Sequence, residues 1–131
     1  MLVDLHRRHR DRGLEVLGLA FEYTGDATID AERVRAYREH HDIEFPILIA
    51  GTADKAKASA ALPILDRVRA YPTLVFLGAD GTVRAIFTGF NGPATGDLHA
   101  RLLEDVERIV EGMLADHAAD AAPSSSSSPS R

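Results

Sequence analysis

The sequence contains no cysteine. Without a thiol, the chain forms no disulfide and has neither a thiolate nucleophile nor a cysteine ligand for a metal. It also has no apolar run near the roughly 18 residues that a membrane span needs. The N-terminus lacks the apolar stretch of a secretory signal, so either the protein is cytosolic or its true start lies upstream of Met1. We therefore expect no membrane span, and the compartment stays open.

Positive charge is also scarce. Fifteen Lys and Arg face 20 Asp and Glu, a formal net charge of −5. Nucleic-acid binders normally spread positive charge over one face. The one basic cluster, Arg7, Arg8, Arg10 and Arg12, has no interleaved aromatic residues and is surrounded by acidic ones. We interpret it as a solvated helix face and expect no nucleic-acid partner.

The remaining composition is that of an ordinary globular domain. The chain has 131 residues, of which 45% are hydrophobic and 27% charged, enough for about one domain with a packed core. Residues 118–131 are mostly Ala, Ser and Pro, a composition that cannot bury a core. The sequence therefore predicts one folded domain over 1–117 and a disordered tail over 118–131.

Hydrophobic periodicity predicts alternating helices and strands in the first half of the chain. A basic helical segment stops at Gly13, and the nearly uniform apolar run that follows predicts a strand buried on both faces. Asp30 is a candidate cap for the second helix, and Pro63 ends the third. The expected elements are a helix over 2–12, a strand over 14–21, a helix over 30–41, a strand over 45–50 and a short helix over 54–62.

The second half predicts a hairpin and a long helix. Residues 74–77 form a third buried strand, and Asp80-Gly81 is a strong hairpin signal before a fourth strand over 83–88. An apolar stripe at helical spacing marks the last helix, with Thr95 or Asp97 as its cap. Strands joined through helices imply parallel pairing, and the hairpin adds one antiparallel strand. The fold class is thus an α/β sandwich with a mixed sheet.

This element order, with Tyr71-Pro72-Thr73 just before a strand and its hairpin, resembles the thioredoxin fold. More narrowly it is similar to the TlpA-type thiol–disulfide oxidoreductases, also called redoxin or alkyl hydroperoxide reductase-related domains. The resemblance implies a three-layer sandwich, protein or peptide thiol and disulfide substrates, and a periplasmic or membrane-anchored location. The stretches that carry it, within residues 1–115, are 13–22, 43–48, 71–77, 80–81 and 88–96.

In that family Pro72 would be the cis-proline of a substrate-binding loop formed by Tyr71, Pro72 and Thr73. Such a loop presents free backbone groups that pair with an extended peptide. From the residues alone, a trans proline that begins a strand is the commoner arrangement. The resemblance implies the cis form and makes these three residues the candidate substrate-binding site.

The chain departs from the family at its N-terminus. The family has a central strand followed by Cys-x-x-Cys at the start of a helix, and Met1 falls inside what would be that helix. The absent strand would lie between the strands over 14–21 and 74–77. Unpaired buried backbone groups cost about 1–3 kcal/mol each. We therefore expect the chain to be poorly stable, to pair those two strands directly, or to self-associate by borrowing a strand.

No other pattern predicts a catalytic or metal site. His6 and His9 are three residues apart, and His40 and His41 are adjacent, but a metal site needs a third ligand and supporting partners. We interpret them as solvated helix histidines and expect no metal and no cofactor. The glycine-rich segment 89–96 lacks the Lys-Ser/Thr pair of a phosphate loop.

Two functions follow. The first is a member of the TlpA-like family that lacks the N-terminal segment and, having no catalytic cysteine, is redox-inactive as this chain. The second is a non-catalytic thioredoxin-like peptide- or protein-binding module that uses the loop at Tyr71, Pro72 and Thr73. The first is favoured at this stage, because a binding module would need its central strand as much as an enzyme does.

Overall fold

The structure, a computed structural model, describes residues 1–65 and 67–121 and has the predicted mixed α/β class. Two short 3₁₀ turns, η1 (Arg10–Arg12) and η2 (Pro93–Thr95), accompany the main elements. No described helix combines the length and apolar character needed to cross a bilayer, in line with the prediction. The main elements are α1 (Leu2–His9), β1 (Gly18–Glu22), α2 (Ala27–His40), β2 (Ile47–Thr52), α3 (Lys55–Ala61), β3 (Thr73–Leu77), β4 (Val83–Thr88) and α4 (Asp97–Ala121).

The four strands form two separate two-stranded sheets, and the predicted single mixed sheet is wrong. β1 pairs with β2 in parallel, and β3 pairs with β4 in the predicted antiparallel hairpin. Within the described residues no strand occupies the other edge of β1 or of β3. Direct pairing of these two strands, one of the three alternatives expected from the sequence, is therefore wrong as well. Side chains connect the sheets instead, because Phe21 and Val75 both pack against one hydrophobic cluster of Ala58, Leu65 and Val68.

β1 is shorter and more exposed than the sequence predicts. The strand begins at Gly18, whose amide donates to the Pro46 carbonyl at 2.9 Å, whereas the Leu14 amide donates to the His9 carbonyl at 3.3 Å. Leu17 and Leu19 are 55% and 41% exposed. The prediction of a strand buried on both faces is therefore wrong, because side chains along this segment remain open to solvent.

The second helix starts earlier than the sequence predicts. Asp26 caps α2 by accepting from the amides of Thr28 and Ile29 at 2.9 and 3.1 Å. Asp30, the predicted cap, lies in the first turn, is buried and accepts a hydrogen bond from the Thr24 hydroxyl. The cap assignment is therefore wrong by one turn.

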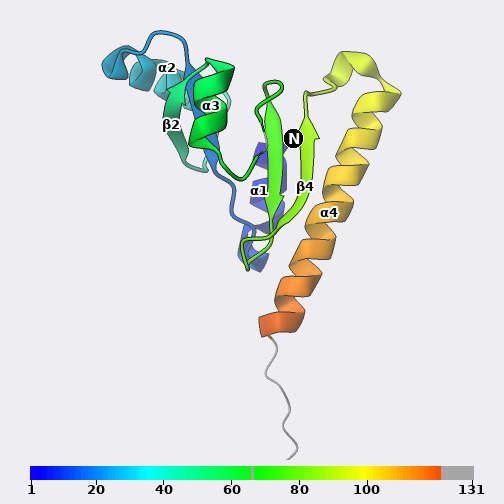
Figure 1. The fold of residues 1–131 in the computed structure, drawn as a ribbon. Helices are drawn as coiled ribbons and strands as arrows, with labels where there is room; N and C mark the ends of the chain where they lie inside the picture. Colours follow the sequence, from blue (N-terminus) through cyan, green and yellow to red (C-terminus); the bar gives the residue numbers. More distant parts are fainter. Residues whose placement is uncertain (66, 122–131) are drawn as a thin grey trace, which may run out of the picture.

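The largest hydrophobic cluster joins α1 to α4. Figure 1 shows α4 beside β4 on one side of the molecule, and α2, β2 and α3 grouped on the other. Phe76 and Phe87 of the hairpin pack against this cluster, whose α4 members lie at the predicted helical spacing. α4 continues to Ala121, so residues 118–121 of the predicted tail belong to the helix, and 122–131 lie outside the described residues. The buried members are Leu5, Leu102, Val106, Val110 and Leu114.

Candidate functional site

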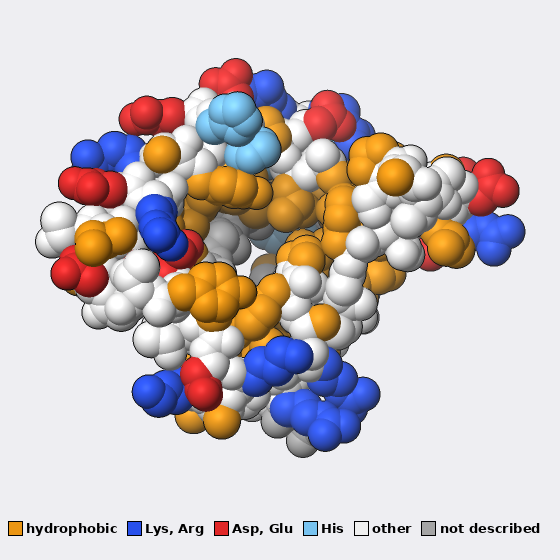
Figure 2. All heavy atoms as spheres, turned by 90° about the horizontal axis from the view of Figure 1, so that it is seen from above, with side chains coloured by type: hydrophobic (Ala, Val, Ile, Leu, Met, Phe, Trp, Pro, Cys, Tyr) orange, Lys and Arg blue, Asp and Glu red, His pale blue; other side chains and the backbone are white. Residues whose placement is uncertain are grey.

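A cleft of about 980 Å³ lies between the two sheets. β1 and the segment before it line one side, and β3 lines the other. Residues after α3 and residues from the C-terminal half of α4 complete the lining. Figure 2 shows a hollow in the molecule with hydrophobic side chains around it. The volume of the cleft is at the upper end of the range of about 300–1,000 Å³ that is typical of ligand sites.

The predicted site residues Tyr71, Pro72 and Thr73 all line this cleft. The Tyr71–Pro72 peptide bond is cis, as the resemblance implies. The Tyr71 ring lies 5.9 Å from the ring of Phe21, centroid to centroid. These contacts place the loop at the end of the cleft where β1 finishes and β3 starts.

The loop is held by its own hydrogen bonds. The Pro72 carbonyl accepts from the Gly89 amide at 2.9 Å. This carbonyl is therefore already paired with the residue that follows β4. The Thr73 hydroxyl donates to the Ala70 carbonyl at 2.7 Å. Burial raises the pKa of Tyr71, with smaller effects from Tyr23 and Asp54, so its hydroxyl stays neutral. The loop therefore offers a fixed, uncharged surface.

The cleft is almost free of charge. Besides Tyr71, the ionisable groups among its described lining residues are Glu15 and His117. Both lie at the end of the cleft near Gly13. Glu15 follows Gly13 by two residues, and a Cβ atom added to Gly13 would lie 3.2 Å from the His117 ring. The lining hydroxyl of Thr73 already donates to the Ala70 carbonyl. This arrangement suits an apolar ligand.

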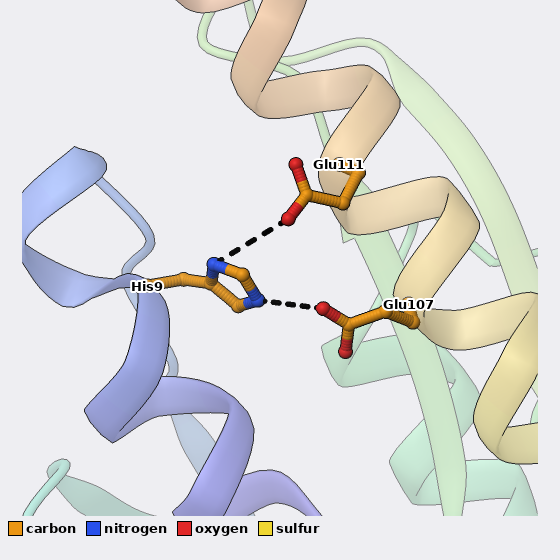
Figure 3. A group of neighbouring side chains, drawn as sticks. All are labelled: His9, Glu107 and Glu111. Carbon is orange, nitrogen blue, oxygen red and sulfur yellow. Dashed lines mark hydrogen bonds and ion pairs between the residues drawn. The ribbon is translucent and has the colours of Figure 1, made fainter.

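A second group of side chains, which the sequence analysis missed, lies between α1 and α4. His9 points between Glu107 and Glu111, two glutamates on successive turns of α4 (Figure 3). Its Nε2 atom is 2.8 Å from Glu107 Oε1, and its Nδ1 atom is 3.9 Å from Glu111 Oε1. His9 is only 6% exposed, so its interpretation as a solvated histidine is wrong.

The other histidines do not complete a metal site with His9. The ring of His6 lies against Phe45, with centroids 5.8 Å apart, so His6 and His9 do not converge. His40 and His41 meet edge to face at 4.8 Å on the surface. The His9 group could be found from sequence only by pairing residues 98 apart, and no local pattern does that.

Arginines already occupy both carboxylates of this group. Arg8 donates to the two oxygens of Glu107 at 2.9 and 2.8 Å, and Arg12 donates to those of Glu111 at 3.0 and 2.9 Å. The hydrogen bond from Arg8, followed by that from His9, lowers the pKa of Glu107 to about 2. A divalent cation would have to displace both guanidinium groups, so the arrangement suits an ion-pair junction that attaches α1 to α4.

The rest of the basic cluster is paired too. Arg7 and Arg10 approach the carboxylate of Glu44 at 3.4 and 3.1 Å. All four arginines of the cluster are thus half-exposed and paired with acidic side chains, in keeping with a solvated helix face surrounded by acidic residues.

Comparison with protein-family models gives no match to this chain, and comparison with curated protein sequences gives no significant match.

Proposed function

We propose that this chain is a cysteine-free, thioredoxin-like binding module that holds an extended polypeptide segment and carries out no redox chemistry. The observation that carries the proposal is the cleft between the two sheets, which is apolar and reaches the loop of Tyr71, Pro72 and Thr73. The similarity of the chain to TlpA-type oxidoreductases is part of the same proposal. It is based on residues 13–22, 43–48, 71–77, 80–81 and 88–96.

The lining favours a polypeptide over the other common ligand classes. Nucleotides and other phosphates need cationic side chains or a glycine-rich loop at a helix N-terminus, and the described lining includes no Lys or Arg. A compact apolar molecule would leave the backbone along the two strands without partners. An extended segment supplies both apolar side chains and backbone hydrogen-bonding groups.

Redox inactivity follows from the chemistry of exchange. Thiol–disulfide exchange begins when a thiolate attacks a disulfide sulfur, and the chain has no cysteine. The similarity to oxidoreductases therefore extends to the binding of a polypeptide and stops before the reaction. Both functions considered from the sequence are redox-inactive, so it is the apolar cleft that favours the binding module.

A binding titration with a matched pair of variants tests the proposal. The probe is an uncharged peptide of about seven residues with alternating Val and Thr, carrying a fluorophore at one end for anisotropy. Leu19→Arg places a charge in the cleft. The matched control is Leu48→Arg, because Leu48 is the residue of β2 that pairs with Leu19 and does not line the cleft. Both leucines are about half-exposed, so neither substitution buries a charge in the core.

We expect Leu19→Arg to weaken peptide binding by at least about tenfold, because the bound segment would desolvate the new charge. Leu48→Arg should leave the affinity unchanged. Equal affinities for the two variants, or no binding to the original chain at about 100 μM peptide, would disprove the proposal.

A further inference from the structure

The backbone of β1 alternates between its paired edge and the cleft. The Gly18 amide donates to the Pro46 carbonyl, and the Glu22 carbonyl accepts from the Ala53 amide. These two residues therefore direct their backbone groups toward β2 and the segments that flank it. Successive residues of a strand direct them to opposite edges, so Leu19 and Phe21 direct their N–H and C=O groups toward the cleft.

β3 alternates in the same way. The Pro72 carbonyl accepts from the Gly89 amide, and the Gly78 amide donates to the Thr82 carbonyl, so the even-numbered residues face the β4 side. Thr73 and Val75 consequently direct their N–H and C=O groups toward the cleft. Within residues 1–65 and 67–121, no strand pairs with this edge.

The residues with these free backbone groups are the ones that line the cleft. Leu19 and Phe21 line it from β1, and Thr73 and Val75 line it from β3. The cleft thus lies between two unpaired strand edges, each with alternating donors and acceptors. A row of such groups is a template for another strand.

The two strands run in opposite directions across the cleft. The end of β1 lies beside the start of β3, since the rings of Phe21 and Tyr71 are in contact. At the other end, Leu14 before β1 and Phe76 near the end of β3 pack against the same hydrophobic cluster. A single strand between them would therefore be parallel to one neighbour and antiparallel to the other.

We propose, on the basis of the binding function above, that the ligand is one extended segment of a separate polypeptide, inserted as a β-strand between β1 and β3. It would join the two sheets into one mixed sheet of order β2-β1-segment-β3-β4. β1 and β3 have five residues each, so the inserted part is about five residues, or about 17 Å, long. Both of its edges make hydrogen bonds.

The free hydrogen-bonding edges of β1 and β3 determine which polypeptide can enter the cleft. A strand that already belongs to a sheet has one edge occupied, and every strand of this chain is paired along one edge within the described residues. A described strand of a second folded copy therefore has one free edge at most and cannot pair with β1 and β3 together. The inserted segment therefore comes from a part of the partner polypeptide that is not paired in a sheet, so that both of its edges are free.

The lining determines which side chains the segment carries. Leu62, Leu65 and Val68 from the region after α3, and Val110 and Leu114 from α4, line the cleft. The matching segment carries apolar side chains such as Val, Ile and Leu and has no charge at its centre. A proline at its centre is excluded, because proline cannot donate to a strand.

Backbone methylation of the peptide tests the insertion. Three variants of the Val/Thr peptide carry N-methyl groups at its central odd positions, at its central even positions, or only at a terminal residue outside the strand. Insertion predicts that the odd and the even variants each lose at least about tenfold in affinity, because each blocks hydrogen bonds along one edge. The terminal variant should bind like the unmodified peptide.

Hydrogen exchange of the protein supplies the second measurement. We expect the amides of Leu19, Phe21 and Val75 to exchange at least about tenfold more slowly in the complex. A loss for one methylation pattern alone, with protection in one strand alone, would overturn insertion in favour of addition to a single edge. Peptide binding that no methylation weakens would overturn the insertion and leave the proposed function standing.

The remaining outcomes concern the source of the segment and the function itself. Sedimentation of the free chain as a dimer, with these amides already protected, would assign the cleft to a second copy and overturn the proposal. Failure of the unmodified peptide to bind at all would overturn the binding function, and the insertion with it.

Discussion

Replacing Glu107 by glutamine tests the junction between α1 and α4, because this one carboxylate accepts hydrogen bonds from both Arg8 and His9. The Arg8–Glu107 pair is partly exposed, with side-chain exposures of 46% and 35%. Pairs of that kind contribute about 0.2–1 kcal/mol. The hydrogen bond from buried His9 to a charged acceptor adds about 1 kcal/mol, since glutamine retains one acceptor oxygen. We expect Glu107→Gln to lower the free energy of unfolding by about 1–2 kcal/mol at neutral pH.

The effect should depend on pH in a defined direction. Arg8, and to a smaller extent His9, lower the pKa of Glu107 from 4.5 to about 2 in the folded chain. A carboxyl group whose pKa is lowered on folding stabilises the protein fully above its unfolded pKa, and this stabilisation is lost as the pH falls toward the folded pKa. Because Glu107 is about one-third exposed, solvent screening limits this contribution to about 1 kcal/mol. The stability difference between the original chain and Glu107→Gln should therefore shrink from about pH 5 to about pH 2.

Urea unfolding followed by far-UV circular dichroism at several pH values measures the difference. The matched control is Asp105→Asn, because Asp105 pairs at 2.9 Å with Arg108 on the same helix and is more exposed. We expect the control to change stability by less than about 0.5 kcal/mol. The reasoning is refuted if Glu107→Gln costs no more than Asp105→Asn at neutral pH, or if its cost grows as the solution is acidified.

Three further predictions concern the core, a helix cap and the chemistry. Val106→Ala should cost about 2–3 kcal/mol in urea unfolding because Val106 is 1% exposed, whereas Leu98→Ala, at a position 53% exposed, should cost less than about 0.5 kcal/mol. Asp26→Ala should cost about 1 kcal/mol because two α2 amides lose their acceptor, and a stability equal to that of the original chain would contradict the cap assignment. In an insulin-reduction assay with dithiothreitol, the chain should leave the uncatalysed rate unchanged, and any acceleration would contradict the requirement for a thiolate.

The order of helices and strands was predictable because it depends on local patterns. Apolar periodicity located the long helix α4, and Asp80-Gly81 located the hairpin between β3 and β4. The cap of α2 was not decided by such patterns, since Asp26 and Asp30 are one helical turn apart and have equal capping ability. Only the packed structure shows that Asp26 accepts from the first amides while Asp30 is buried.

The candidate site was predictable in part. The resemblance named Tyr71, Pro72 and Thr73 as a substrate-binding loop, and these residues line the cleft, while their role in binding stays a prediction. The separation of the strands into two sheets was not, because an apolar run such as 14–21 indicates residues suited to burial and does not show which edges have partners. The group of His9, Glu107 and Glu111 joins residues that only the packing of α1 on α4 brings together.

The position of the unpaired edges has a consequence for solubility. A free strand edge on the outside of a protein promotes aggregation by pairing with the edge of a neighbouring sheet. Here the edges of β1 and β3 that have no partner strand among the described residues face a shared cleft. On the proposed insertion, a bound segment would pair both of these edges and so remove them as sites of sheet-to-sheet aggregation.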